Sequence, residues 1–119
     1  MIGESGAKPR RGEIYRVDFS PARGTEQSGH RLALIVQNDR GNQYSPYTVV
    51  VAVSSAQLPK VYPFTVLLKE GDGNLTRSGH VNCAQLLTLD QARLGERIGA
   101  LDETIMRKVD SALRYELNL

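Results

Sequence analysis

The sequence predicts a mainly β fold, built as a strongly bent antiparallel sheet or a small open β-barrel with one α-helix at its C-terminal end. Two observations support this class. Short strand-like runs recur between turn signals over most of the chain. The only long run with helical periodicity is the last segment. With 119 residues, the chain has the length of one domain, which we expect at residues 10–119, after a disordered tail of residues 1–9.

Three runs in the first half of the chain predict strands. Glu13–Phe19 alternates polar and apolar residues, as a half-buried strand does. Leu32–Val36 is a short apolar run of strand length. Thr48–Val53 is rich in β-branched residues and predicts a central strand buried on both faces. Between the last two runs, Asn38–Asn42 is a cluster of turn-forming residues.

The next part of the chain predicts shorter elements. Phe64–Leu68 has the composition of a further strand. Gly79–Thr88 predicts either one bent strand or two short strands. Asp90–Leu94 predicts a single helical turn, and Arg97–Ile98 predicts a brief edge strand because a glycine lies on each side of it.

The C-terminal segment predicts the one long helix. Asp102 can cap it by accepting a hydrogen bond from a free backbone amide of the first turn. Leu101 and Met106 occupy the two positions of a hydrophobic staple. Apolar residues repeat at helical spacing and form one face, which packs on the sheet. They are Ile105, Met106, Val109, Ala112, Leu113 and Leu117.

Composition excludes several classes of protein. The net charge of +2 is too small to indicate nucleic-acid binding by itself, although Lys and Arg are concentrated in residues 1–31. Cys83 is the only cysteine, so neither an internal disulfide nor a thiolate metal site is expected. No apolar run approaches the roughly 20 residues of a membrane span, and no signal-peptide core precedes the domain. The sequence therefore predicts a cytoplasmic protein.

The segment Arg23–Leu32 is the most informative part of the chain. It places two arginines, a histidine, a carboxylate and two glycines between two strand-like runs. Glycines allow a backbone to approach a ligand closely, and guanidinium groups bind phosphate in a bidentate way. Because such a polar loop adds nothing to a small core, it predicts an anion-binding active site.

The residue types favour chemistry without a metal or other cofactor. Metal-dependent cleavage needs clustered carboxylates or histidines, and no H-x-x-x-H, D-x-D or C-x-x-C pattern occurs. Cys83 lies in a strand-like run, where a free cysteine is usually buried filler. RNA carries its own nucleophile in the 2′-hydroxyl group, so an enzyme that cuts it must stabilise a pentavalent phosphorane and move two protons.

Each of these functions has candidate residues. Arg31 suits stabilisation of negative charge, and Ser54 and Ser55 can donate hydrogen bonds to a phosphate oxygen at the end of the central strand. Glu26 or His30 can take a proton. Taken singly, each of these residues also has a structural interpretation as a solvated surface group or a turn former.

Ordered motifs across residues 10–119 resemble the MazF/PemK family of toxin endoribonucleases. The resemblance rests on the order and spacing of these motifs rather than on any one of them. They are Arg11-Gly12-Glu13-Ile14-Tyr15, Asp18-Phe19-Ser20-Pro21, Gly24 to Arg31, Val36-Gln37-Asn38-Asp39, Gly41 to Pro46, Lys60 to Phe64, Gln85, Thr88-Leu89-Asp90, Arg93-Leu94 and the helix Asp102–Leu119.

This resemblance implies an SH3-like barrel with a C-terminal helix, assembled as a homodimer. It implies a metal-independent endoribonuclease that cuts single-stranded mRNA by attack of the 2′-hydroxyl group, and a cognate antitoxin that covers the RNA groove. The catalytic positions of the family fall on Arg31, Ser54 and Glu26. The predicted substrate contacts are Arg23, Gln27, His30, Ser55, Lys60 and Gln85.

Three departures from the family pattern bear on the site. Leu32 stands where a proline usually follows the arginine, and Ser54 stands where threonine is commoner. Serine keeps the hydroxyl but lacks the methyl group that restricts rotamers. Ala84 and Leu87 stand where many relatives carry an acidic and a basic residue, which affects the RNA sequence recognised.

Two other functions remain open at this point. CcdB-type toxins are expected to share the fold, and they poison DNA gyrase without being nucleases; that role would depend on the helix end at residues 115–119. The other alternative is a non-catalytic RNA-binding or antitoxin-binding module, which requires Arg31 to be buried in a structural salt bridge.

Overall fold

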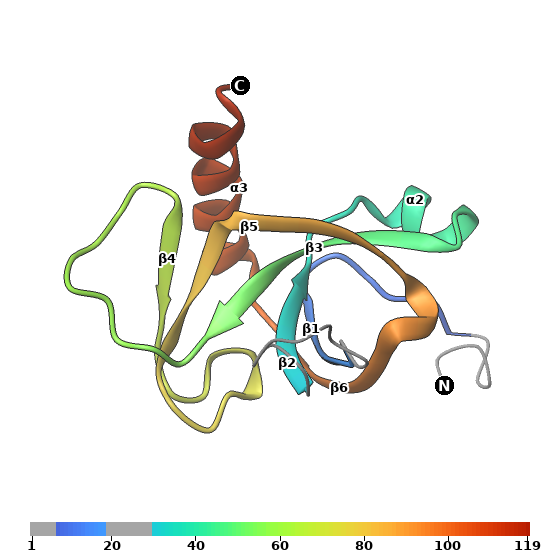
Figure 1. Cartoon of the computed structure of the whole chain (residues 1–119), viewed down its shortest axis with the longest axis horizontal. Coiled ribbons are helices and arrows are strands. Elements are labelled where there is room, and N and C mark those ends of the chain that lie inside the picture. The colour runs from blue at the N-terminus through green and yellow to red at the C-terminus, as the bar shows by residue number, and fades with distance from the viewer. Residues whose placement is uncertain (1–6, 19–29) are drawn as a thin grey trace, which may run out of the picture.

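The structure is a computed structural model that describes residues 7–18 and 30–119, with the backbone alone for His30. Its described part is a six-stranded antiparallel sheet in the order β4-β5-β3-β2-β1-β6. The strands are β1 (Glu13–Asp18), β2 (His30–Ile35), β3 (Tyr47–Ser54), β4 (Thr65–Leu68), β5 (Gly79–Asp90) and β6 (Leu94–Ala100). Figure 1 shows helix α3 (Glu103–Leu117) beside β4 and β5. A mainly β fold with a C-terminal helix is therefore confirmed.

The central strand β3 divides the core into two clusters. Val51 and Val53 point to the side that α3 covers, where they pack with Met106 and Val109. The other side of β3 carries Val50, which packs in a second cluster lined by residues of β1, β2 and β6. Because both faces of β3 are buried, the prediction of a central strand buried on both sides is confirmed.

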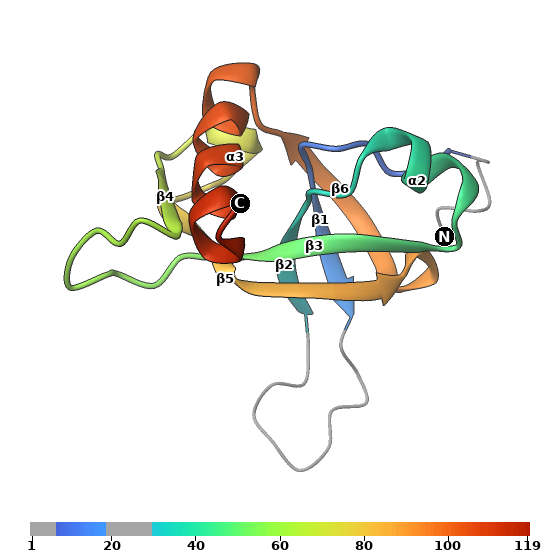
Figure 2. The ribbon, with the colours of Figure 1, turned by 90° about the horizontal axis from the view of Figure 1, so that it is seen from above.

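A register shift bends β5 in the middle. Val51 of β3 pairs with Leu86, but the next residue, Ala52, pairs with Asn82. The residues between Asn82 and Leu86 are therefore extra on the β5 side, and such a bulge bends its strand. One bent strand is thus the correct one of the two alternatives for this segment. Figure 2 shows β3 and β5 running side by side along the sheet.

Helix α3 begins as predicted. The carboxylate of Asp102 accepts a hydrogen bond from the amide of Ile105 at 2.9 Å. Leu101 and Met106 are both buried, as the staple requires. The single turn Gln91–Arg93 is also confirmed, because the Asp90 side chain caps it through the amide of Ala92.

Three sequence expectations need correction. The segment expected as a turn cluster forms helix α2 (Asp39–Tyr44), since the Asn38 side chain accepts from the amide of Gly41 at 2.7 Å and caps it. The expected brief edge strand is the full strand β6, paired with β1. Lys8 and Pro9 are packed rather than loose: Pro9 is buried, and the ammonium of Lys8 donates to Gln91 at 3.2 Å. Residues 1–6 of the predicted tail lie outside the described residues.

The end of β1, the start of β2 and the end of β3 lie together at one end of the sheet. Strands β1 and β2 pair from Ile14 with Leu34 to Asp18 with His30, so the segment between them leaves and re-enters at one end of the sheet. Strand β3 also ends there, because Leu32 pairs with Val53. No helix in the described part of the chain is long and apolar enough to cross a membrane.

Candidate active site

A hollow of about 510 Å³, here called the first hollow, lies at the end of β2 and β3. Arg31 enters it from β2, and Ser54 enters it from β3. The register that pairs Leu32 with Val53 places these two residues opposite each other on the neighbouring strands. Directly opposite residues of an antiparallel pair have their side chains on the same face. The structure therefore brings together the two leading sequence candidates.

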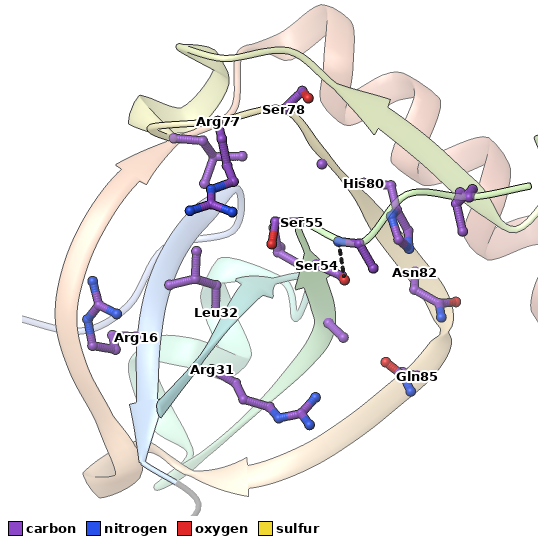
Figure 3. Close-up of a pocket in the computed structure, with 16 residues that line it drawn as sticks. Arg16, Arg31, Leu32, Ser54, Ser55, Arg77, Ser78, His80, Asn82 and Gln85 are labelled. Carbon is purple, nitrogen blue, oxygen red and sulfur yellow. Dashed lines mark hydrogen bonds between the residues drawn. The ribbon is translucent and has the colours of Figure 1, made fainter. Parts of the chain in front are cut away.

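Ser54 is held in a defined orientation. Its hydroxyl oxygen accepts a hydrogen bond from the amide of Ala56 at 3.0 Å, which makes a local turn at the strand end. An accepting hydroxyl still has its own proton to donate. The hydroxyl group of Ser54 can therefore donate to an anion bound in the first hollow (Figure 3).

A close backbone contact supports this position. Gly79 of β5 lies against the carbonyl group of Ser54, and a Cβ atom at position 79 would clash with that oxygen. Only glycine lets the two backbones approach so closely. Gly79 is therefore part of the support for the Ser54 hydroxyl, although sequence reasoning assigned it no role.

The first hollow is strongly cationic. Three arginines, Arg16, Arg31 and Arg77, are among the residues that line it, and no Asp or Glu of the described residues is. Arg16 also lies 3.7 Å from Glu96 in an exposed ion pair, which is a weak interaction in water. A concave surface lined by charges of one sign concentrates counter-ions. The site therefore suits a polyanion.

The other predicted residues divide into four groups. Ser55 and Gln85 line the first hollow with Arg31 and Ser54. Lys60 does not; its ammonium lies 5.4 Å from the ring centroid of Tyr62, so its part in binding phosphate stays a prediction. His30 begins β2 with its backbone paired to Asp18. The predictions for Arg23, Glu26 and Gln27 concern positions outside the described residues.

Sequence reasoning also missed polar residues that reach the first hollow. Arg16 is exposed within the alternating pattern of β1, and its place beside the first hollow is visible only with the sheet assembled. Arg77 and Ser78 precede β5, and His80 and Asn82 belong to it. The signal for the last two was the alternation of polar and apolar residues at the start of β5, which marks one polar face.

The remaining reactive groups do not belong to this site. Burial raises the pKa of the Cys83 thiol to about 11, so it is neither a thiolate nor a nucleophile at neutral pH. This confirms the expectation that Cys83 is a buried structural residue. Among the side chains described for residues 7–18 and 31–119, no three His, Cys, Asp or Glu groups are placed to hold a metal ion together.

Known proteins resemble this chain over nearly its whole length. A protein of Staphylococcus epidermidis named Endoribonuclease MazF is 38% identical over 110 residues, which are 92% of this chain and 92% of that protein. A mycobacterial structure described as an endoribonuclease in complex with its cognate antitoxin has a TM-score of 0.78 and 28% identity, covering 93% of this chain and 96% of that one. MazF of Deinococcus radiodurans has a TM-score of 0.73 and 28% identity, covering 95% of this chain and 99% of that one.

The family whose members are described as PemK-like, MazF-like toxins of type II toxin-antitoxin systems matches residues 10–117. This match spans both strands that carry the Arg31 and Ser54 side chains, and it extends to the end of helix α3. The chain belongs to the PemK-like, MazF-like toxin family of type II toxin-antitoxin systems.

Proposed function

We propose that this chain is the toxin of a type II toxin-antitoxin system and acts as a sequence-specific, metal-independent endoribonuclease on single-stranded mRNA. Its relatives named as endoribonucleases support the activity. The observation that carries the assignment of the site is the placement of Arg31 opposite Ser54 in a hollow lined by three arginines.

The reaction begins with attack of an RNA 2′-oxygen on the adjacent phosphorus. The bond from phosphorus to the 5′-oxygen breaks, which leaves a 2′,3′-cyclic phosphate and a 5′-hydroxyl group. One proton leaves the 2′-hydroxyl, and one is delivered to the departing 5′-oxygen. Arg31 stabilises the extra charge on the phosphorane, and Ser54 donates a hydrogen bond to a non-bridging oxygen. Glu26 and His30 are the candidates for proton transfer.

The remaining substrate contacts surround these two residues. Ser55 and Gln85 line the same hollow and can bind phosphate or base groups of the strand. Arg23, Gln27 and Lys60 complete the proposed set. The exposed guanidinium of Arg31 does not meet the condition for a non-catalytic module, which was burial of that residue in a structural salt bridge.

The proposal extends to fold detail, assembly and location. The bent sheet with its C-terminal helix is an SH3-like barrel, and two copies form a homodimer. A cognate antitoxin inhibits the toxin; the mycobacterial relative solved with its antitoxin supports this. An acidic segment is suited to a cationic hollow by charge. The protein acts in the cytoplasm, where mRNA is available.

A cleavage assay in EDTA tests the enzyme assignment. Long single-stranded RNA is incubated with wild-type protein, with Arg31→Ala and with Arg107→Ala, and the cut sites are mapped by primer extension. Arg107 is a matched control because it is an exposed arginine of α3 that does not line the first hollow. We expect cutting at a short recurrent sequence by wild type and Arg107→Ala, and a loss of about 10²-fold or more for Arg31→Ala.

Two results would overturn the proposal. One is inactivity of the wild-type protein on varied RNAs, and the other is full activity of Arg31→Ala. Gyrase-dependent DNA cleavage without RNA cutting would favour the alternative toxin class instead.

A further inference from the structure

A second hollow lies next to the first. It also has a volume of about 510 Å³ and is bounded by β4, the start of β5 and helix α3. Its walls carry two ammonium groups, Lys69 after β4 and Lys108 on α3, together with the amide of Gln57. None of these three side chains lines the first hollow, and none had a role in the site described above.

The two hollows adjoin each other along a shared wall. Six residues line both of them, three from the segment that follows β3 and three from the start of β5 and the residue before it. These shared residues are Ser55, Ala56, Leu58, Ser78, Gly79 and His80. The second hollow therefore lies directly beside any strand that is bound in the first, at the end of β3.

The charge of the second hollow favours an anion. Lys69 and Lys108 are both exposed, and no ion pair joins either ammonium to a carboxylate within the described part of the chain. One carboxylate, that of Asp72, lines the hollow, and it accepts a hydrogen bond from the backbone amide of Lys69 at 2.8 Å. Two ammonium groups against one already engaged carboxylate leave a positive balance.

His80 lies in the wall between the hollows. It pairs with Ser54 across β3 and β5, and Figure 3 shows its imidazole between Ser54 and Asn82. The side chain is only 4% exposed. Its Nδ1 atom is buried without a hydrogen-bond partner among the described residues. Leaving a polar atom buried without a partner is unfavourable, and a bound ligand or water commonly satisfies such an atom.

We propose that the second hollow is a further phosphate subsite for the RNA strand, in which Lys69 and Lys108 bind backbone phosphates beside the cleavage position. The proposal rests on the endoribonuclease function. An enzyme that cuts inside a strand must hold RNA on both sides of the scissile phosphate. The second hollow, across the shared wall, holds the RNA strand on one of these two sides. Lysine binds phosphate as a point charge without selecting a base, so this subsite adds affinity rather than sequence preference.

Salt-dependent binding measures the number of phosphates contacted. For a single strand, the slope of log K against log salt changes by about 0.7 for each phosphate that a cation neutralises. We would compare wild type with Lys69→Ala/Lys108→Ala by fluorescence anisotropy, using a non-cleavable RNA with 2′-O-methyl groups. The matched control is Arg40→Ala/Arg107→Ala, which also removes two exposed positive charges but from neither hollow.

The expected result is specific to the lysine pair. The magnitude of the slope of log K against log salt falls by about 1.4 for Lys69→Ala/Lys108→Ala. It stays near the wild-type value for the control variant Arg40→Ala/Arg107→Ala. This loss of affinity is expected with an oligonucleotide of about ten nucleotides and not with one of about three, because single-strand sites of OB-folds, for comparison, span roughly 4–16 nucleotides. Equal melting temperatures of the variants show that all of them fold.

The outcomes separate this proposal from the function on which it rests. Suppose that wild type cuts RNA and that Lys69→Ala/Lys108→Ala binds and cuts like wild type at every salt concentration. The proposed second subsite is then wrong, and the enzyme assignment stands. If both double variants lose affinity equally, the effect is that of net charge, and the subsite is again wrong. If Lys69→Ala/Lys108→Ala binds RNA normally but loses affinity for an acidic antitoxin peptide, the second hollow is a protein-binding site instead. If wild type neither binds nor cuts RNA, the function itself is wrong.

Discussion

Gly79 packs so closely against Ser54 that a Cβ atom at position 79 would clash with the Ser54 carbonyl oxygen. This contact links β5 to the end of β3, where the proposed hydrogen-bond donor of the site is located. The position of the side chain that we propose to act on RNA thus depends on a residue that has no side chain.

Gly79→Ala is expected to lower both stability and cleavage. The added methyl group forces the two backbones apart, at a cost of about 1–3 kcal/mol for overpacking, and it moves Ser54 away from the phosphate position. Thermal denaturation and single-turnover cleavage measure the two effects. Gly41→Ala is the comparison, because the atoms nearest to a Cβ there belong to the side chain of Gln37 rather than to a backbone. Wild-type cleavage by Gly79→Ala would contradict the role assigned to this contact.

Ser54→Ala is expected to reduce cleavage, and Ser54→Thr to preserve it. Removing one hydrogen-bond donor to a developing negative charge costs about 10²–10³ in kcat, whereas threonine keeps the hydroxyl. Ser54 is half-buried, and the change to alanine also removes the acceptor of the Ala56 amide, which threonine retains. Single-turnover kinetics at saturating RNA isolates the chemical step. If Ser54→Ala cuts as fast as Ser54→Thr, the hydroxyl group does not take part in the reaction.

His80→Leu is expected to keep or increase the stability of the RNA-free protein. Leucine fills a similar space and removes the unpaired Nδ1 atom, which costs about 1–3 kcal/mol when buried alone. A gain of 1 kcal/mol corresponds to a rise in Tm of roughly 3–6 °C for a chain of this size. His80→Gln, which retains a polar group, is the comparison. A clear fall in the Tm of His80→Leu would mean that the imidazole has a stabilising partner in the folded protein.

The folded protein is expected to lose stability at high pH because of Tyr15. Burial raises the pKa of Tyr15 to about 12 from its ordinary 10.0, and its hydroxyl also donates to Glu13 at 3.0 Å. The fold therefore favours the protonated phenol, and this contribution is complete below pH 10 and is lost as the pH rises through about 12. Denaturant unfolding at several pH values should show a steeper decline for wild type than for Tyr15→Phe. Parallel curves for the two proteins would rule out this contribution.

Local patterns in the sequence were sufficient for most of the elements. The cap at Asp102, the staple of Leu101 and Met106, and the β-branched run of β3 all form as predicted. These features depend on neighbouring residues and on spacing along the chain. The segment at Asn38 was misread as a turn because a capping side chain and a turn former are the same residue types.

Residue chemistry made Arg31 and Ser54 candidates, and the ordered motifs led to the family whose catalytic positions fall on both. Their placement opposite each other was decided by the register of β2 on β3. Register is a property of paired strands, and a shift by one residue reverses the side from which every side chain projects. The sequence therefore determined which residues are suited to phosphate chemistry.

Only the tertiary structure decided which further residues join them. Arg16 and Arg77 are far apart in the sequence from each other and from Ser54, yet all three line one hollow. The second hollow likewise needs β4, β5 and α3 to be assembled before Lys69 and Lys108 share a wall. Such groupings follow from how the sheet bends at β5 and where the helix packs. Local sequence patterns do not carry that information, because the contacts join residues that are distant along the chain.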